Sequence, residues 1–157
     1  ICLQEGRSNL PENVKVLSLG KTKNYKPNLL RLIAVFGEYI WNERENYDAV
    51  FVHMNQEYIL LGGWLWRLLG KKIYFWRNHP KGSILTKIAV WLSNKVFYTS
   101  PSSYAAQFKK SAQMPVGIDT NLFQKHNSSS IIHNSILMLG RISPIKNVHL
   151  MLEAAII

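Results

Sequence analysis

Length, composition and charge exclude several classes of protein. The chain has 157 residues, of which 47% are hydrophobic and 18% are charged, so it is neither disordered nor fibrous. A single cysteine cannot form an internal disulfide and favours a reducing compartment. The 19 Lys and Arg outnumber the 9 Asp and Glu, and the net charge of +10 indicates an anionic partner such as nucleic acid, an acidic membrane or a phosphorylated ligand.

The first half of the chain alternates strand and helix patterns. Residues 14–19 alternate in polarity and predict a strand, whereas residues 29–40 carry apolar residues at helical spacing. Residues 49–53 form a short apolar run that is typical of a buried parallel strand. A helix is then expected over 57–69, because a glycine follows it at the usual cap position, and a third strand over 73–76.

The alternation continues through the middle of the chain. The pattern predicts a helix over 84–92, a fourth strand over 96–99, a helix over 102–110 and a short extended piece over 114–117. Strands that alternate with helices favour a parallel α/β sheet. The fold class is therefore α/β.

A polar segment without periodicity divides the chain. Residues 124–134 are typical of a linker, and after them the pattern restarts with a strand over 136–139 and a helix over 148–157. We therefore predict that residues 1–123 form most of a first domain and that residues 135–157 begin a second one. We expect both domains to be incomplete and the chain to be a fragment of a longer protein.

The positive charge is concentrated in the middle of the chain. Residues 1–57 are neutral overall, whereas residues 58–118 contain nine Lys or Arg and no acidic residue. The same segment holds four of the five Trp. Basic residues among Trp suit a membrane interface and also single-stranded nucleic acid. For any one Trp, a place in the core remains the simpler interpretation.

The best candidate for a binding site follows the strand expected over 136–139. Gly140 lets the backbone turn tightly, and Pro144 suits a first helical turn. Arg141 and Lys146 then lie around a helix N-terminus, at the carboxyl edge of a sheet, where such residues bind anions. On spacing alone, an ordinary solvated turn remains the simpler interpretation. The scattered His and lone Cys do not predict a metal site.

Three segments occur in an order that resembles the retaining glycosyltransferases of family 4 (glycosyl transferases group 1). They are Val96–Ser100, then Pro115–Phe123 with the pattern G-[VI]-D-x-x-x-F, then Ile136–Lys146 with the pattern G-R-x-x-x-x-K. Residues 48–63 and 72–79 also look like the acceptor-side domain of that family. The resemblance implies the B-type glycosyltransferase fold of two facing Rossmann-like domains. It also implies a nucleotide-sugar in the cleft and transfer with retention of configuration, usually without a metal.

The resemblance assigns roles to particular residues. Gly140, Arg141 and Lys146 are expected to bind the donor diphosphate, where the two cations stabilise the leaving group as its bond breaks. His53 and His79 each follow an expected strand, so both are predicted to lie at the carboxyl edge of the sheet. His79 is the preferred catalytic residue, as the histidine that contacts the transferred sugar. His53 and Gly117 are candidates for lining the cleft, and for each of them a purely structural role is the alternative interpretation. No cofactor is implied, since the nucleotide-sugar is a substrate, and no metal is expected.

The resemblance also defines the expected function and its limits. The full-length protein would transfer a sugar to a glycan or lipid-linked acceptor in the cytoplasm. It would contact the inner face of an anionic membrane through residues 58–118. The paired Glu motif of the family is expected downstream of the chain and the first strand upstream, so the fragment is expected to be inactive alone. The alternatives are a basic nucleic-acid-binding module, which no recognised motif supports, and a non-catalytic relic. The sequence does not name the donor, the acceptor or the oligomeric state.

Overall fold

The computed structural model describes residues 1–3, 10–25, 27–115, 117, 119–121, 142 and 147–155. The chain forms two compact units, Ile1–Gly117 and Ile118–Ile157, and each is described by itself.

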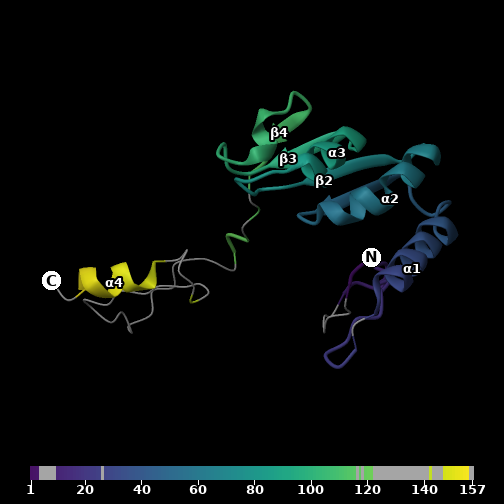
Figure 1. Cartoon of the computed structure of the whole chain (residues 1–157), viewed down its shortest axis with the longest axis horizontal. Helices are drawn as coiled ribbons and strands as arrows, with labels where there is room; N and C mark the ends of the chain where they lie inside the picture. The colour runs from purple at the N-terminus through teal and green to yellow at the C-terminus, as the bar shows by residue number, and fades with distance from the viewer. Residues whose placement is uncertain are drawn as a thin grey trace. The chain divides into compact units, whose positions relative to one another are not determined.

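The first unit contains a parallel sheet (Figure 1). Within the described residues the sheet has four strands in the order β1-β2-β3-β4, and all neighbouring strands run parallel. The strands are β1 (Ala49–His53), β2 (Lys72–Trp76), β3 (Lys95–Tyr98) and β4 (Ser111–Gln113). The parallel α/β architecture that the sequence predicts is confirmed for these strands.

Helices alternate with the strands, as the sequence indicates. Helix α1 (Leu29–Asn42) precedes β1, α2 (Gln56–Leu68) joins β1 to β2, and α3 (Ile84–Leu92) joins β2 to β3 (Figure 1). Because each strand is added on the same side of the previous one, right-handed crossovers place α2 and α3 on the same face of the sheet.

Local signals fix where these helices begin and end. Asn28 caps α1, since its side-chain oxygen accepts a hydrogen bond from the backbone N–H of Arg31 at 2.8 Å. Ser83 and Thr86 form a reciprocal capping box at the start of α3. Gly70 follows α2 with a φ of +69°, a left-handed conformation that glycine adopts without strain.

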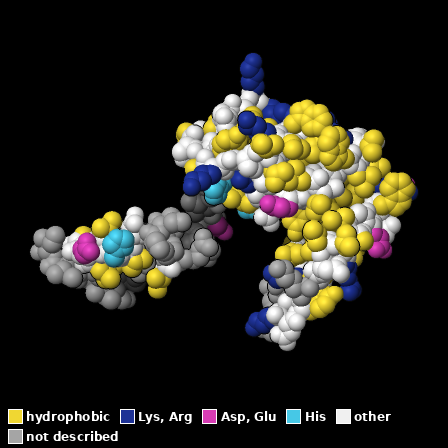
Figure 2. Space-filling model, viewed as in Figure 1, with side chains coloured by type: hydrophobic (Ala, Val, Ile, Leu, Met, Phe, Trp, Pro, Cys, Tyr) yellow, Lys and Arg dark blue, Asp and Glu magenta, His cyan; other side chains and the backbone are white. Residues whose placement is uncertain are grey.

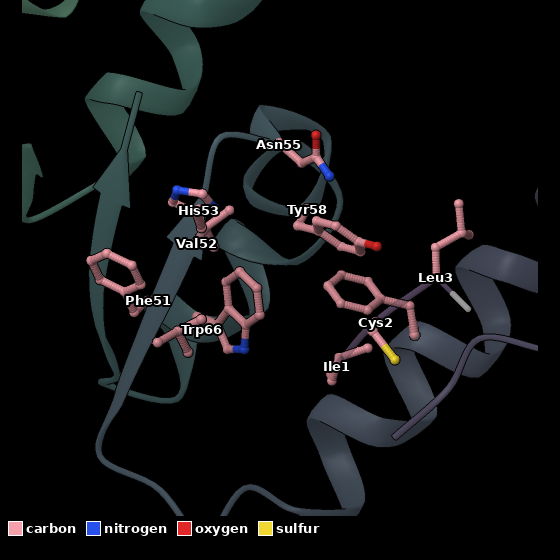
Figure 3. Close-up of a pocket in the computed structure, with 11 residues that line it drawn as sticks. Ile1, Cys2, Leu3, Phe51, Val52, His53, Asn55, Tyr58 and Trp66 are labelled. Carbon is pink, nitrogen blue, oxygen red and sulfur yellow. The ribbon is translucent and has the colours of Figure 1, made fainter. Parts of the chain in front are cut away.

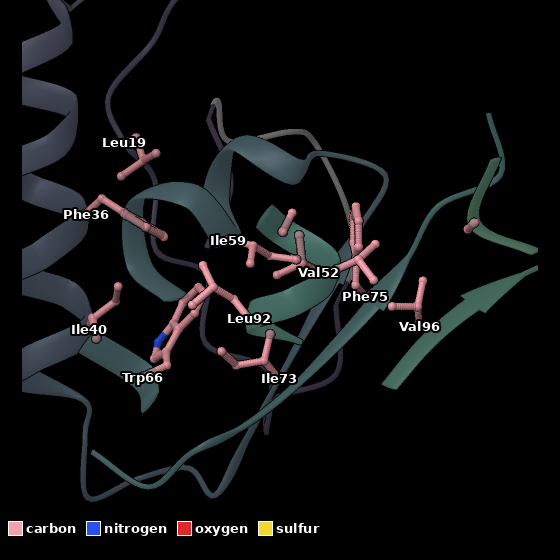
Figure 4. Packing of buried hydrophobic residues seen from close by; sticks show 13 residues of the cluster. Leu19, Phe36, Ile40, Val52, Ile59, Trp66, Ile73, Phe75, Leu92 and Val96 are labelled. Carbon is pink, nitrogen blue, oxygen red and sulfur yellow. The ribbon is translucent and has the colours of Figure 1, made fainter. Parts of the chain in front are cut away.

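The core lies between the sheet and the helices (Figure 4). Ile73 and Phe75 of β2 and Val96 of β3 are fully buried, and they lie under Ile59 of α2 and Leu92 of α3. These side chains alternate along the strands with residues that point to the other face, as a two-residue period requires. The buried face is thus the one that α2 and α3 cover.

Two predicted elements differ from the observed structure. The strand expected over 14–19 is reduced to one isolated parallel bridge between Cys2 and Ser18. The prediction of a helix over 102–110 is wrong. Residues Tyr104–Gln107 form a short 3-10 helix, η1, and the chain then forms β4. Pairing with β3 requires an extended backbone there, so tertiary hydrogen bonding overrides the local helical spacing.

The second unit contributes α4 (Val148–Ala155), which agrees with the helix expected over 148–157. The linker expected over 124–134 and the strand expected over 136–139 lie outside the described residues. None of the helices in the described ranges combines the length and apolar character needed to cross a bilayer.

Candidate functional site

The loops that follow the parallel strands meet at one edge of the sheet. His53 is the last residue of β1 and pairs in register with Trp76, the last residue of β2. Arg77, Asn78 and His79 come directly after β2. Both histidines predicted to lie at the carboxyl edge therefore lie there, where ligands of open α/β sheets bind.

Hydrogen bonds hold the loop after β2 against the loop after β3. The side-chain oxygen of Asn78 accepts from the backbone N–H groups of Thr99 at 3.2 Å and Ser100 at 2.8 Å. The Ser103 hydroxyl donates to the carbonyl of Arg77 at 3.0 Å, and the N–H of Tyr104 donates to the carbonyl of His79 at 2.9 Å. The loop that follows β3 thus holds the backbone that carries His79 in place.

Of the two ring nitrogens of His79, Nε2 is available to bind a ligand, whereas Nδ1 is occupied. Its Nδ1 lies 3.0 Å from the carbonyl oxygen and 3.1 Å from the backbone nitrogen of Lys81. Nδ1 donates to the oxygen in one tautomer and accepts from the N–H in the other, so Lys81 occupies it in both. The residue is exposed, so Nε2 is the ring atom that can form a hydrogen bond with a ligand.

Arg77 lies beside His79 and was not predicted as a site residue. One terminal nitrogen, Nη2, donates to the carbonyl of Lys81 at 3.3 Å. Its Nε is buried, and among the described residues it has no hydrogen-bond partner. Because residues 58–118 contain no acidic side chain, this cation is suited to an anionic ligand. Its position directly after the strand expected over 73–76 was the signal that could have identified it.

His53 borders a separate, mostly apolar pocket of about 370 Å³ (Figure 3). Residues 1–3, α1 and the β1–α2 segment line it, with Asn55 and Tyr58 as its other polar members. Burial is the main cause that raises the pKa of the Tyr58 hydroxyl, and the charges of Cys2 and Glu57 add to it. His53 itself lies against Trp76, with 6.1 Å between ring centroids. The pocket can therefore accept an apolar group more readily than a charged one.

The other predicted site residues are less informative. Gly117 is exposed, and an added Cβ there would meet no atom within 4 Å, so no close approach explains the glycine. Gly140, Arg141 and Lys146, the residues expected to bind the donor diphosphate, lie outside the described residues.

Besides Arg77, three cations of residues 58–118 bind backbone carbonyl groups. Lys71 Nζ donates to the carbonyl of Tyr47 at 2.6 Å, and Arg67 Nε donates to that of Leu92 at 2.8 Å. Lys110 Nζ donates to three carbonyls at the end of α3, at 2.8 to 3.1 Å. Burial, and then the charge of Arg67, lower the pKa of Lys110. Part of the positive charge of residues 58–118 thus stabilises the fold by satisfying backbone carbonyl groups.

Within the described ranges, no group of three or more His, Cys, Asp or Glu is arranged to hold a metal ion. The chain was also compared with protein-family models, with curated proteins and with solved structures, and none of the three comparisons finds a match.

Proposed function

We propose that the chain is part of a retaining glycosyltransferase and that residues 1–117 are its acceptor-side domain. The observation that carries this proposal is the order of the three motifs, Val96–Ser100, Pro115–Phe123 and Ile136–Lys146. The parallel sheet supports it, because the first of these motifs begins within β3 and ends at the same carboxyl edge as His53 and His79.

The proposed chemistry is departure of a nucleoside diphosphate from the donor sugar. Arg141 and Lys146 stabilise the negative charge that develops on the diphosphate, without exchanging a proton. His79 orients the transferred sugar through a hydrogen bond from or to Nε2. Arg77 is a further cation beside His79 that can attract the anionic part of the donor.

Binding of nucleoside diphosphates tests the proposed donor site. We expect the 157-residue chain to bind at least one of UDP, GDP or ADP in saturation-transfer NMR. Arg141→Gln and Lys146→Gln should each weaken binding about tenfold, because each removes a charge-assisted contact to phosphate. Lys125→Gln is the matched control, since it removes the same charge outside the motifs. Absence of binding, or an equal loss in the control, would contradict the proposal.

The contact with the sugar requires a separate measurement. His79→Ala should weaken binding of the nucleotide-sugar but leave binding of the matching nucleoside diphosphate unchanged. His53→Ala should change neither affinity, because His53 lies against Trp76. We expect binding without turnover, since the paired Glu motif of the family does not occur in these residues. Sugar transfer or donor hydrolysis by the chain would show this last expectation to be wrong.

A further inference from the structure

Helices α2 and α3 carry apolar stripes on the side that faces away from the sheet. We call this surface the α2–α3 outer face. Its apolar members are Leu61, Trp64 and Leu68 of α2 and Ile84, Ile88 and Trp91 of α3. Within each helix they are three or four residues apart, so they form one stripe per helix. Leu68 is 85% exposed, Trp91 61% and Trp64 55%.

The outer face is apolar even though both helices already bury their opposite side. Ile59 and Trp66 of α2 and Ala89 and Leu92 of α3 belong to the core beneath it. A helix that is hydrophobic on all sides is normally covered by protein or lipid. Hydrophobic side chains gather over α2 and α3 in the space-filling view, and Lys or Arg side chains lie close by (Figure 2).

The two exposed Trp lie together at the centre of this face. The ring centroids of Trp64 and Trp91 are 5.3 Å apart. A hollow of about 390 Å³ lies between the helices and is lined by these two rings, Arg67 and Leu92. Indole rings next to a cation are typical of the headgroup level of a bilayer, where one part of the side chain is apolar and another is hydrated.

The charge around the Trp pair has one sign. Arg67 donates to the carbonyls of Leu92 and Trp91, which places its guanidinium at the end of α3. Lys87 is exposed one helical turn before Trp91, and Lys110 also binds the carbonyl of Trp91. Glu57, which is exposed in the first turn of α2, lies about two helical turns before Trp64, and no acidic residue occurs between Tyr58 and Ile118. A positive field of this kind complements anionic lipid.

We propose that the α2–α3 outer face docks on an anionic phospholipid bilayer. Trp64 and Trp91 enter the interface, and Arg67 and Lys87 contact the lipid phosphates. Apolar burial and cation attraction act together because the two kinds of side chain share this face. The proposal needs no glycosyl transfer, so it can fail or succeed independently of the function proposed above.

Co-sedimentation of the 157-residue chain with vesicles tests the proposal. We expect binding to vesicles of 70% phosphatidylcholine and 30% phosphatidylglycerol, and much weaker binding to phosphatidylcholine alone. Binding should also weaken as salt is raised. Lack of binding to the anionic vesicles, or equal binding to both, would overturn the proposal.

Matched variants locate the bound surface. The double variant Trp64→Gln and Trp91→Gln should weaken binding more than about tenfold. Two indole rings are then no longer transferred from water into the bilayer interface, and the favourable free energy of that transfer is lost. Trp41→Gln is the control, because Trp41 is 52% exposed on α1 outside the face and should leave binding unchanged. Leu68→Gln provides a second test if the double variant does not fold, since this side chain is almost fully exposed.

A second pair of variants separates local charge from net charge. Lys87→Gln should weaken binding about fivefold, as expected for one cation near an anionic surface. Lys95→Gln changes the net charge equally, but Lys95 lies at the start of β3, outside α2 and α3, and should have a smaller effect. Equal losses in both variants would overturn a specific docking face. So would self-association of the chain that Trp64→Gln and Trp91→Gln abolish, because a second copy would then cover the face.

Discussion

At the scale of single residues, the sequence shows how many cations there are but not what they do. Lys109 and Lys110 are adjacent and chemically identical, yet the structure separates them. Lys109 is exposed, whereas Lys110 Nζ donates to the carbonyls of Val90, Trp91 and Ser93. A cation in this position satisfies the terminal carbonyls of α3 and interacts favourably with the helix dipole.

Replacing Lys110 should therefore destabilise the fold. We expect Lys110→Met to lower the free energy of unfolding by about 1 kcal/mol, since hydrogen bonds to three carbonyls are lost. Lys109→Met makes the same change in charge and should stay within about 0.5 kcal/mol of wild type. Urea denaturation of both variants measures the difference. Equal stabilities would mean that the carbonyl contacts contribute nothing.

The same lysine predicts a dependence on pH. Burial and Arg67 lower the pKa of Lys110 below its ordinary 10.5. Between the folded-state pKa and 10.5, the unfolded chain binds more protons at this position, so stability from this group rises with pH. Urea denaturation from neutral pH toward 10.5 should show the stability gap between wild type and Lys110→Met widening. A gap that narrows would contradict the lowered pKa.

At the scale of elements, the contact between α1 and α2 depends on a glycine. Phe36 and Ile40 are the buried residues of α1, and they approach α2 at Gly62. A Cβ at Gly62 would lie 2.7 Å from Ile40 Cδ1 and 3.0 Å from Phe36 Cε1. The helices can approach this closely only because residue 62 has no side chain.

Gly62→Ala should separate the two helices and destabilise the chain by about 1–2 kcal/mol, because overpacking outweighs the gain in helix propensity. Gly37→Ala is the matched control in the neighbouring helix, where an added Cβ meets nothing within 4 Å. That change should stabilise the chain by about 0.5–1 kcal/mol. Thermal unfolding of both variants gives the comparison, and shifts in the same direction would contradict this account of the contact.

At the scale of the whole molecule, the fold lies in residues 1–117. This unit contains β1 to β4 together with the helices that cover the sheet. Its buried hydrophobic cluster runs from Leu19 to Ala105. Among the described residues, every member of this cluster therefore lies before residue 118.

A chain shortened to residues 1–117 should fold by itself. We expect its unfolding midpoint to stay within about 4 °C of that of the 157-residue chain, since the buried cluster seen in the described residues is retained. A chain that ends at residue 110 lacks β4 and leaves β3 at the edge of the sheet, so its midpoint should fall by more than about 4 °C. Circular dichroism melts of the three chains test this, and a shortened chain without cooperative unfolding would disprove it.

The sequence by itself determined the alternation of strands and helices. Apolar runs such as 49–53 and the cap glycine Gly70 are local signals, so they predict elements without knowledge of the partners. It also placed His53 and His79 at the carboxyl edge, because that position follows from strand order along the chain. The proposed donor site, with Arg141 and Lys146, remains a prediction from sequence alone.

Only the tertiary structure decided which of these residues meet. β4 replaced the helix expected over 102–110 because pairing with β3 is a contact between distant parts of the chain. Arg77 became a candidate because burial of its Nε depends on how the loop folds around it. For any one Trp the sequence favoured a place in the core, but the direction in which each helix packs on the sheet leaves Trp64 and Trp91 exposed. The fold therefore separates cations such as Lys71 and Lys110, which bind carbonyl groups, from exposed cations such as Lys87, which remain for an anionic partner.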